Sequence, residues 1–514
     1  MALHAALRKS AAAFPDKTWL QYQGAQWTYA EGDAISDRIA ANLLRIGVKP
    51  GDRVALLFTN CPELVFCYFA CFKIGAIAVP INTRFQTSEL IYTLNHAQAR
   101  ILIGQADLCS TLLASRAELP DLSKIHVAGT TLPPEGTASF DALCQIVEAA
   151  VAFPEVEEEQ LAVLLYTSGT TARPKGVMHS HATLRQQSEN YLATLGAEVY
   201  AQTLISLPMC HIAAFSIWLL TATFAAGTIT ILPRFEPEAV LRAIAENGIT
   251  YSGGLPVMVN ALINSPAAHE HDVSSLRLFT AGGDCVPLEM QNRFKELFGI
   301  HVDELCGMTE VMYANQPFNL GLRRPGSIGK PFGDVRIRLV NPDGQDVPPG
   351  SVGEIVVYSG AVTLGYWNDP DNTAAAIQDG GMHTGDLARQ DADGFLWFAG
   401  RSKDIIIRGG SNISPGEVED ILYAHHAVYE AGVVGVPCSE LGQRVRAYVA
   451  LKPGAQATER NLIDWAAQKI AAYKAPESIV FLPALPKGPT GKVLRKALRD
   501  WASAEQKQLQ NSSG

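Results

Sequence analysis

The chain shows two spacings of apolar positions that alternate along its first half. From Ala30 to Leu44 apolar residues recur every three to four positions, which predicts an amphipathic helix. The short apolar runs Arg53–Phe58 and Ala76–Ile81 predict strands, and the apolar segment Glu63–Phe72 between them predicts a buried helix. Such alternation of helix and strand is typical of a mostly parallel α/β sheet.

The same alternation continues to about residue 280. Further strands are predicted at Ala99–Ile103, Leu204–Leu207, Thr228–Leu232, Ile249–Ser252 and Leu276–Thr280. The uncharged stretch Ile212–Leu232 has the length of a membrane span, but it contains four threonines and is interrupted by Gly227. We interpret it as a buried helix followed by a strand. The expected fold is therefore a large N-terminal domain with two α/β sheets.

The pattern changes after about Ser327. Short alternating strands with close turns run to Phe398 and predict a small antiparallel barrel or sheet. Beyond Gly400, helices predicted at Pro415–Ala424 and Glu459–Tyr473 interleave with strands, which indicates a smaller α+β domain at the C-terminal end. The polar stretch Gln506–Gly514 is predicted to be a frayed tail.

Composition and charge narrow the classes of function. The 514 residues include 41 basic and 51 acidic side chains, and the net charge of −10 argues against nonspecific binding of nucleic acid or of an anionic membrane surface. Nine cysteines, scattered without a C-x-x-C pair, indicate reduced thiols and no structural zinc site. No secretory signal is expected in the first residues, so a cytoplasmic location is predicted.

The segment Leu164–Val177 is the strongest candidate for chemistry. An apolar strand-like run ends in small hydroxyl and glycine residues that could hold a polyphosphate, and these are Thr167, Ser168, Gly169, Thr170, Thr171 and Lys175. The common nucleotide loop G-x-x-x-x-G-K-[ST] is not matched, because Lys175 precedes the second glycine and Val177 replaces the hydroxyl that would bind a metal. A Walker-type NTPase is therefore disfavoured. A solvated loop of the same composition remains the alternative.

Four further segments carry weaker signals. Cys306–Glu310 places the hydroxyl of Thr309 beside a carboxylate that could hold Mg²⁺. Thr384–Asp386 is expected in a turn between two strands, where the aspartate could accept hydrogen bonds from two ribose hydroxyls. Gly409 and Gly410 are expected to join a strand to a helix and would leave room for a slim ligand. Lys492 follows a glycine in a turn-rich stretch. Each segment alone also fits an ordinary solvated turn, but all five occur together.

Taken together, these segments resemble the acyl-adenylate-forming superfamily, which includes acyl-CoA synthetases and the adenylation domains of peptide synthetases. The resemblance covers nearly the whole chain. It is carried by Tyr166–Val177, Gly307–Glu310, Thr384–Asp386, Gly400–Asp404 with Gly409–Pro415, and Pro486–Arg495. It implies an enzyme that uses ATP and Mg²⁺ to convert a carboxylate into acyl-AMP and then transfers the acyl group to CoA.

The resemblance also implies roles for single residues. Thr167 to Lys175 would hold the β and γ phosphates, Thr309 the α phosphate, Glu310 the Mg²⁺, and Asp386 with Arg401 the ribose. Lys492 would act between the substrate carboxylate and the α phosphate, where charge must be neutralised. Lys403 would be the hinge between domains 1–402 and 403–514, whose rotation would bring Gly409 and Gly410 to the CoA tunnel.

Two positions depart from the superfamily pattern. Ala172 stands where a glycine is common in the phosphate loop. Cys306 stands where an aromatic residue usually stacks on adenine, so the base would have to rely on the backbone of Gly282 and Gly283 and on apolar walls. The nucleotide site is completed by Gly307 and Met308.

The expected substrate is a small carboxylic acid. Pro208–Ser216 offers no acidic residue to hold an ammonium group, which disfavours an amino acid, and His211 matches a superfamily histidine near the acyl group. A structural histidine remains an alternative for that position. The expected acyl pocket consists of His211, Ile212, Ala213, Phe215, Val311 and Met312.

A medium-chain fatty acid is the preferred substrate, and a small aryl or branched acid is the alternative. Two other functions stay open, namely an adenylating enzyme that loads a carrier protein and a non-enzymatic relative. The expected partners are the acid, ATP and CoA, without nucleic acid or a membrane span, and a homodimer is left open.

Overall fold

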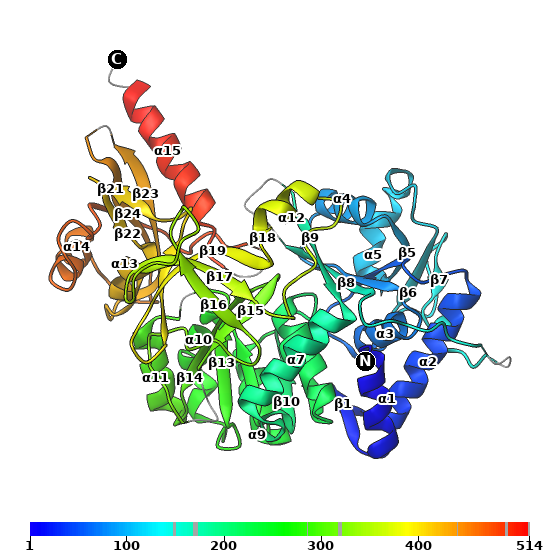
Figure 1. The fold of residues 1–514 in the computed structure, drawn as a ribbon. Helices are drawn as coiled ribbons and strands as arrows, with labels where there is room; N and C mark the ends of the chain where they lie inside the picture. The colour runs from blue at the N-terminus through cyan, green and yellow to red at the C-terminus, as the bar shows by residue number, and fades with distance from the viewer. Residues whose placement is uncertain are drawn as a thin grey trace.

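The computed structural model describes residues 1–147, 151–167, 173–284, 286–316, 321–438, 440–488 and 492–511. These residues form four sheets, and the two larger sheets stand side by side in the N-terminal part of the chain (Figure 1). The prediction of an α/β protein with a large N-terminal domain and a smaller C-terminal one is confirmed. No helix within the described ranges combines the length and the apolar character that a membrane span requires.

The first large sheet has seven strands in the order β7-β6-β5-β3-β4-β8-β9. Its strands are β3 (Arg53–Leu57), β4 (Ile77–Pro80), β5 (Ala99–Gln105), β6 (Lys124–Ala128), β7 (Ala138–Ser139), β8 (Leu161–Thr167) and β9 (Lys175–Ser180). All neighbours are parallel except β8 and β9, which form an antiparallel hairpin. The helices α4 (Thr87–Ala97), α5 (Ala106–Leu113) and α6 (Asp141–Cys144) and the 3-10 turn η1 (Arg116–Glu118) belong to this half.

The second large sheet has eight strands in the order β15-β14-β13-β12-β10-β11-β1-β2. Its strands are β1 (Thr18–Tyr22), β2 (Ala25–Thr28), β10 (Gln202–Ile205), β11 (Thr228–Ile231), β12 (Tyr251–Gly254), β13 (Leu278–Gly282), β14 (Val302–Met308) and β15 (Val311–Asn315). One face is covered by α9 (Pro237–Asn247), α10 (Pro256–Ile263) and α11 (Leu288–Phe298), which share an apolar core with β10, β13 and β14. The 3-10 turns η2 (Ala197–Tyr200) and η4 (Pro266–His269) connect elements of this half.

The main core lies between the two sheets. It contains side chains from α1 (His4–Ala13), α2 (Tyr29–Arg45), α3 (Pro62–Lys73), α7 (His181–Leu195), the π-helix η3 (Ala213–Leu220) and α8 (Thr221–Phe224), together with residues of both sheets. The start of α2 is fixed by a capping box, because Thr28 accepts from the Glu31 amide and Glu31 accepts from the Thr28 amide. The predicted buried helix and strand within Ile212–Leu232 are present as η3, α8 and β11.

The third sheet is antiparallel and has five strands. It consists of β16 (Arg336–Val340), β17 (Val352–Tyr358), β18 (Ile377–Gln378), β19 (Gly381–Gln390) and β20 (Leu396–Arg401), with α12 (Pro370–Ala376) before β18. The short alternating strands predicted after Ser327 are therefore confirmed. The motif Thr384–Asp386, which we placed in a turn, lies instead within β19, where Gly385 adopts a φ of +70° and the register to β17 shifts.

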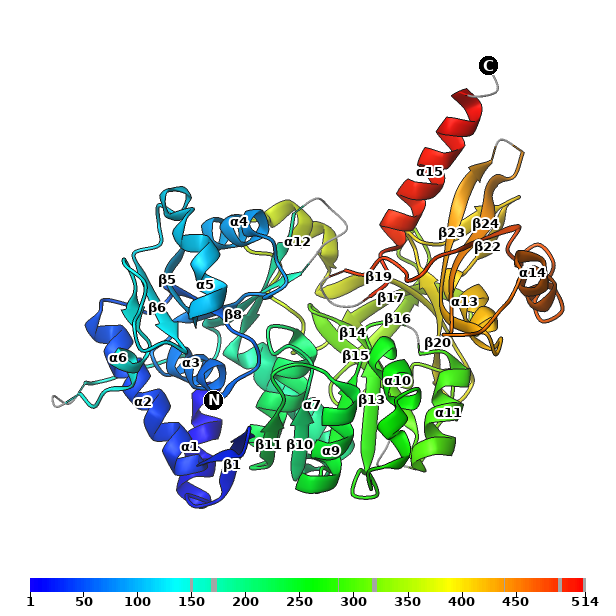
Figure 2. The same ribbon diagram turned by 180° about the vertical axis from the view of Figure 1, so that it is seen from behind.

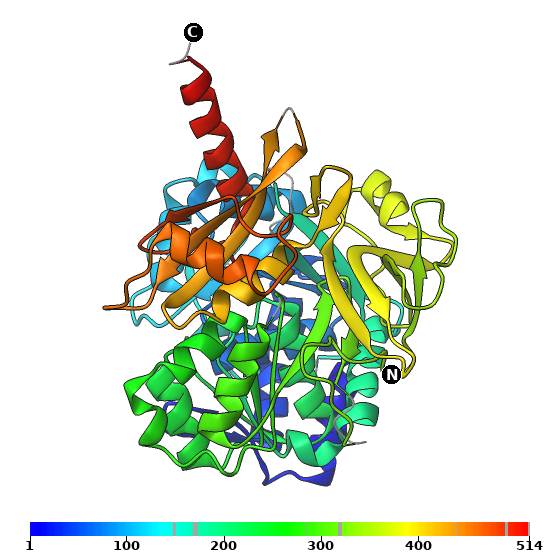
Figure 3. The same ribbon diagram turned by 90° about the vertical axis from the view of Figure 1, so that its left-hand side faces the viewer.

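The C-terminal part has its own five-stranded sheet. It contains β21 (Ile406–Arg408), β22 (Ser411–Ile413), β23 (Val428–Cys438), β24 (Gly442–Leu451) and β25 (Ser478–Phe481), with the helices α13 (Pro415–Tyr423), α14 (Glu459–Ala467) and α15 (Arg495–Asn511). Figures 2 and 3 show it above the eight-stranded sheet, with α15 projecting away from the body.

Two predictions about this region were wrong. The helix predicted at Glu459–Tyr473 ends at Ala467, because the amides of Lys469 and Ile470 both bond to the Ala466 carbonyl and the i to i−4 series of the helix stops there. The polar residues from Gln506 to Asn511, predicted to be frayed, continue α15. Buried Leu498 and Ala502 pack the first turns of α15 against β23, and helix formation then propagates from that docked start.

Candidate active site

The phosphate-loop candidate connects two paired strands. Thr167 at the end of β8 lies directly opposite Lys175 at the start of β9. The Lys175 ammonium donates to Asn372 Oδ1 at 2.7 Å and lies 4.7 Å from the centre of the Tyr366 ring. The predicted phosphate ligands Ser168, Gly169, Thr170 and Thr171, and the departure Ala172, lie outside the described residues. Strand pairing thus fixes both ends of the loop.

The Gly-Met-Thr-Glu motif is the turn of the β14–β15 hairpin, because Met308 pairs with Val311 and only Thr309 and Glu310 lie between them. The buried imidazole of His179 donates from Nε2 to the Thr309 carbonyl at 2.8 Å. Burial lowers the pKa of His179 to about 4, so the ring is neutral and its Nδ1 accepts from Thr183 at 3.1 Å. The turn is therefore held in place by β9.

Glu310 is a buried carboxylate within this turn. Only 6% of the residue is exposed, and its Oε1 accepts from the Tyr366 hydroxyl at 2.7 Å. Burial raises the pKa of Glu310, while Tyr366, Arg401 and Lys175 act in the opposite direction. A single buried carboxylate fits a Mg²⁺ ion that takes its other ligands from phosphates and water. Within the described ranges, no three acidic, histidine or cysteine side chains cluster as an all-protein metal site would need.

Asp386 contacts two side chains, through a hydrogen bond at one oxygen and an ion pair at the other. Tyr313 donates to Oδ2 at 2.7 Å, and Arg401, its neighbour across β19 and β20, lies with Nε 2.9 Å from Oδ1. The Cys306 thiol donates to the Tyr313 hydroxyl at 3.1 Å, and burial raises the thiol pKa to about 12. Cys306 therefore supports Tyr313, which is fully buried and orients Asp386.

Lys492 reaches this group from the C-terminal part of the chain. A Cβ at Gly283 would lie 3.2 Å from Lys492 Cε and 3.5 Å from Nζ, so the lysine stem packs on the glycine at the end of β13. Burial lowers the pKa of Lys492, and Asp284 opposes that shift, with Asp386 also nearby. Burial and the Lys492 charge also lower the pKa of His211 to about 4. Lys492 and the neutral ring of His211 thus lie near one another beside the Gly-Met-Thr-Glu motif.

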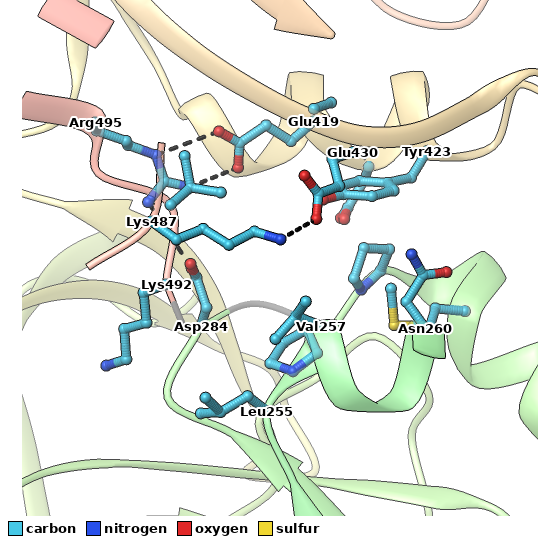
Figure 4. A pocket seen from close by; sticks show the side chains of 16 residues that line it. Leu255, Val257, Asn260, Asp284, Glu419, Tyr423, Glu430, Lys487, Lys492 and Arg495 are labelled. Atoms are coloured by element: carbon cyan, nitrogen blue, oxygen red, sulfur yellow. Dashed lines mark hydrogen bonds and ion pairs between the residues drawn. The ribbon is translucent and has the colours of Figure 1, made fainter. Parts of the chain in front are cut away.

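Polar contacts join the C-terminal part of the chain to the N-terminal part. Arg495 binds Glu419 of α13 at 2.5 Å and lies 3.8 Å from Asp284 of the N-terminal part. Asn260 of α10 donates to the Tyr429 carbonyl at 3.3 Å. The cleft between these elements is shown in Figure 4, where the Lys492 side chain extends away from the acidic groups on the far wall.

The expected hinge residue Lys403 and the expected CoA-tunnel residues Gly409 and Gly410 lie in two turns that follow β20. Lys403 is exposed in the turn between β20 and β21, next to Asp404, which binds Arg499 at 2.7 Å. Gly409 and Gly410 form a two-residue turn between β21 and β22 with φ values of +55° and +81°. This corrects our expectation that they join a strand to a helix, and the turn is typical of a tight hairpin. A Cβ at Gly410 would meet no atom within 4 Å.

The expected acyl-pocket residues do not all face one space. Phe215 packs against Tyr68 with ring centres 4.6 Å apart, toward α3. Val311 lies in the core of the five-stranded sheet, whereas Met312, its neighbour on β15, lies in the main core with Ile212 and partly buried Ala213. Successive side chains on a strand point to opposite faces, which is why Val311 and Met312 separate. His211 Nε2 is buried and has no protein partner.

Two family models match the chain. The model of the AMP-binding enzyme matches residues 7–367, and that of the AMP-binding enzyme C-terminal domain matches residues 417–492. The chain belongs to the AMP-binding enzyme family. The resemblance stated from the motifs is therefore confirmed, as is the expected class of acid–thiol ligase. CoA ligases of the AMP-binding enzyme family use ATP, Mg²⁺ and CoA.

The names of relatives of this AMP-binding enzyme contain several different acids. A feruloyl-CoA synthase of Amycolatopsis sp is 34% identical over 94% of this chain and 96% of its own length. A long-chain-fatty-acid–CoA ligase of Bacillus subtilis (strain 168) is 33% identical over 96% and 94%, respectively. Among solved structures, the anthranilate CoA ligase AuaEII in complex with anthranoyl-AMP is 29% identical, covers 98% of both chains and superposes with a TM-score of 0.91.

Three site residues of this AMP-binding enzyme were missed by the sequence analysis. These are His179, Tyr313 and Tyr366, which hold Thr309, Asp386 and Glu310 respectively. His179 gave a weak signal, since it lies four residues after Lys175 and directly after the apolar pair Val177 and Met178. Tyr313 and Tyr366 gave none, because a tyrosine in an apolar strand or before a tryptophan is typical of core packing.

Proposed function

We propose that the protein is an ATP-dependent acid–CoA ligase with domains 1–402 and 403–514. In the first step a carboxylate oxygen attacks the α phosphorus of ATP, acyl-AMP forms and pyrophosphate leaves. In the second step the CoA thiol attacks the acyl carbonyl, the thiol proton is released, and AMP leaves. The observation that carries this proposal is Lys492, which reaches from the C-terminal domain to Gly283 and Asp386 beside the β14–β15 turn.

The first step brings two anions together, so its barrier depends on charge neutralisation. The Lys492 side chain is the group that would act between carboxylate and α phosphate, and Asp284 opposes the lowering of its pKa by burial. Thr309 would donate to the α phosphate, Lys175 would bind the outer phosphates, and Asp386 with Arg401 would hold the ribose. His179 already holds the turn that carries Thr309, and Tyr313 already holds the Asp386 carboxylate. Neither group has to reorganise when ATP binds, which supports these roles.

Mg²⁺, which Glu310 would hold, supplies positive charge to the departing pyrophosphate when bound. Burial raises the pKa of Glu310, and the hydrogen bond from Tyr366 opposes that shift by favouring the ionised form. Cys306 leaves no aromatic ring at its position, so we propose that Gly282 and Gly283 together with apolar walls hold the adenine.

The second step would require the C-terminal domain to move. Lys403 lies in an exposed turn between two sheets, which suits a hinge, and the contacts across the cleft include polar ones that a rotation could break. Rotation would withdraw Lys492 and bring Gly409 and Gly410 to the pantetheine arm of CoA. A homodimer and a cytoplasmic location stay predictions.

The finer substrate prediction, a medium-chain fatty acid, has support from the apolar residues around Ile212 and Met312. The aryl alternative has support from the unpartnered polar groups of Gln187 and Tyr191 beside the same core. The relatives whose names include feruloyl, long-chain fatty acid and indoleacetate show that the family fold accommodates both classes.

The test incubates the protein with ATP, Mg²⁺ and a panel of acids that includes octanoate, cinnamate and 4-hydroxycinnamate. Each mixture receives either free CoA or a phosphopantetheinylated carrier protein, and thioesters are identified by mass. We expect acyl-CoA with equal amounts of AMP and pyrophosphate. A thioester on the carrier alone would replace CoA ligation by carrier loading, and ADP in place of AMP would refute the adenylation chemistry.

A further inference from the structure

Buried polar side chains without partners lie between α7 and η3. The amide of Gln187 is 1% exposed, and neither its oxygen nor its nitrogen has a hydrogen-bond partner. The Tyr191 hydroxyl, one turn further along α7, and the Ser216 hydroxyl of η3 are fully buried and also unpartnered. Buried polar groups are normally satisfied, and each unmade hydrogen bond destabilises by about 1–3 kcal/mol. The cluster therefore calls for a polar occupant.

The cluster lies beside the reacting centre. The helix α7 begins one residue after Ser180 of β9, whose His179 binds the Thr309 carbonyl, and η3 begins two residues after His211. At a rise of about 1.5 Å per residue, Gln187 lies roughly 10 Å along α7 from Ser180. The two helical segments pack against each other, so Gln187 and Ser216 lie on helices of one layer.

The sheet forms the other wall of this layer. Tyr251 of β12 and Leu278 of β13 are neighbours in register and belong to the main core with Tyr191. Burial raises the pKa of Tyr191, and Tyr251 and Cys306 add to the shift, which places the Tyr191 hydroxyl near both the sheet and the motif. Helical side chains lean toward the start of their helix, so Gln187 and Tyr191 both lean toward the Thr309 end.

An unsubstituted alkyl or aryl group in this layer would leave Gln187 and Tyr191 unpartnered. A hydroxyl or carbonyl would satisfy them, since an amide and a phenol can each donate and accept. We infer that the acid carries a hydroxyl or carbonyl group at the end remote from its carboxylate, and that Gln187 and Tyr191 bind this group. The inference rests on the proposed CoA ligase function and names the substrate class of its acyl site.

The experiment compares two pairs of acids that differ only in a terminal hydroxyl, 4-hydroxycinnamate with cinnamate and 8-hydroxyoctanoate with octanoate. The measured quantity is the ratio of kcat/KM for acyl-CoA formation within each pair. Sites built to bind a hydroxyl discriminate strongly against the analogue that lacks it. We expect the hydroxylated acid to be preferred at least about 100-fold in one pair. Ratios near one in both pairs would overturn the inference.

Gln187→Leu keeps the size of the side chain and removes its polar atoms. We expect it to lower the preferred ratio at least tenfold while activity on the unsubstituted acid is kept or rises. A structural role would lower both members of the pair equally and leave the ratio unchanged, which would overturn the assignment of Gln187. Tyr191→Phe is the second variant, with the same expected direction, and it decides the matter if Gln187→Leu does not fold.

Gln291→Leu is the matched control. Gln291 is also a buried glutamine, but it lies on α11 over the opposite face of the same sheet and donates to the Val286 carbonyl at 2.9 Å. We expect Gln291→Leu to lower the stability of the protein and to leave the ratio of kcat/KM within each pair of acids unchanged. If acyl-CoA formed only from the unsubstituted acids, the inference about the hydroxyl group would be overturned and the proposed CoA ligase function would stand. Absence of acyl-CoA from all four acids would overturn the proposed function and the inference with it.

Discussion

Gly283→Ala tests whether Lys492 acts where the structure holds it. The added Cβ would lie 3.2 Å from Lys492 Cε, 3.5 Å from Nζ and 3.1 Å from Leu255 Cδ2. Two of these three distances are too short for ordinary contact, so the lysine stem must move by a few tenths of an ångström. The same substitution strains the backbone, because Gly283 has a φ of +84°.

The two effects can be separated by magnitude. An alanine at positive φ destabilises by about 1 kcal/mol, whatever surrounds it. Displacing a catalytic group by about 1 Å can lower a rate roughly 100-fold, so a smaller displacement of Lys492 is expected to lower acyl-AMP formation about tenfold. Gly299→Ala is the matched control, since Gly299 has a φ of +75° and no atom within 4 Å of its Cβ position.

The assay follows pyrophosphate release for the first step and thioester formation from supplied acyl-AMP for the second. We expect Gly283→Ala to slow the first step about tenfold and the second much less, because Lys492 is expected to withdraw before CoA reacts. Gly299→Ala should lose similar stability and neither activity. Equal loss of both steps in Gly283→Ala would refute the argument, because Gly283 would then act through the bound adenylate.

Three other predictions address the domain movement and the buried charges. Lys492→Ala should reduce acyl-AMP formation at least about 100-fold, the scale on which removal of one charge-stabilising group acts, while acyl-AMP supplied with CoA is still converted. Gly410→Leu should spare pyrophosphate release and block thioester formation, whereas Gly454→Leu, at a similar φ of +75° and equally open, should affect neither step. Burial raises the pKa of Glu304 to about 8, so its contribution to stability is present below about pH 4.5 and is lost as pH rises through about 8. From pH 6 to 8.5 the free energy of unfolding should fall by about 2.5 kcal/mol on this account, and Glu304→Gln should remove that fall while exposed Glu238→Gln leaves it.

Each of these three predictions has an outcome that would contradict it. Equal loss of both steps in Lys492→Ala would remove the assigned role of the lysine. Normal thioester rates in Gly410→Leu would separate that turn from CoA. An unchanged pH profile in Glu304→Gln, measured by denaturant unfolding, would mean that other groups dominate, with Asp420, whose pKa burial raises to about 7, the next to replace.

Much of the fold and of the reaction class could be predicted from the sequence, because the signals are local. Apolar spacing indicated the helix α2 and the strands around it, and the hydroxyl and glycine residues before Lys175 indicated a phosphate loop. The order of the motifs then indicated the family, since each motif is a short loop or turn that a few adjacent residues specify. Errors arose at ends of elements such as α14 and α15, where local signals are weak.

The tertiary structure alone decided which side chains meet. The partners of the site lie far apart in the chain, with His179 binding Thr309, Tyr313 binding Asp386, and Lys492 packing on Gly283. Burial, which also depends on the whole fold, decided that His179 is neutral and that Gln187 lacks a partner. The physical reason is that the sequence specifies backbone preferences residue by residue, whereas desolvation and hydrogen-bond pairing arise only when distant segments pack together.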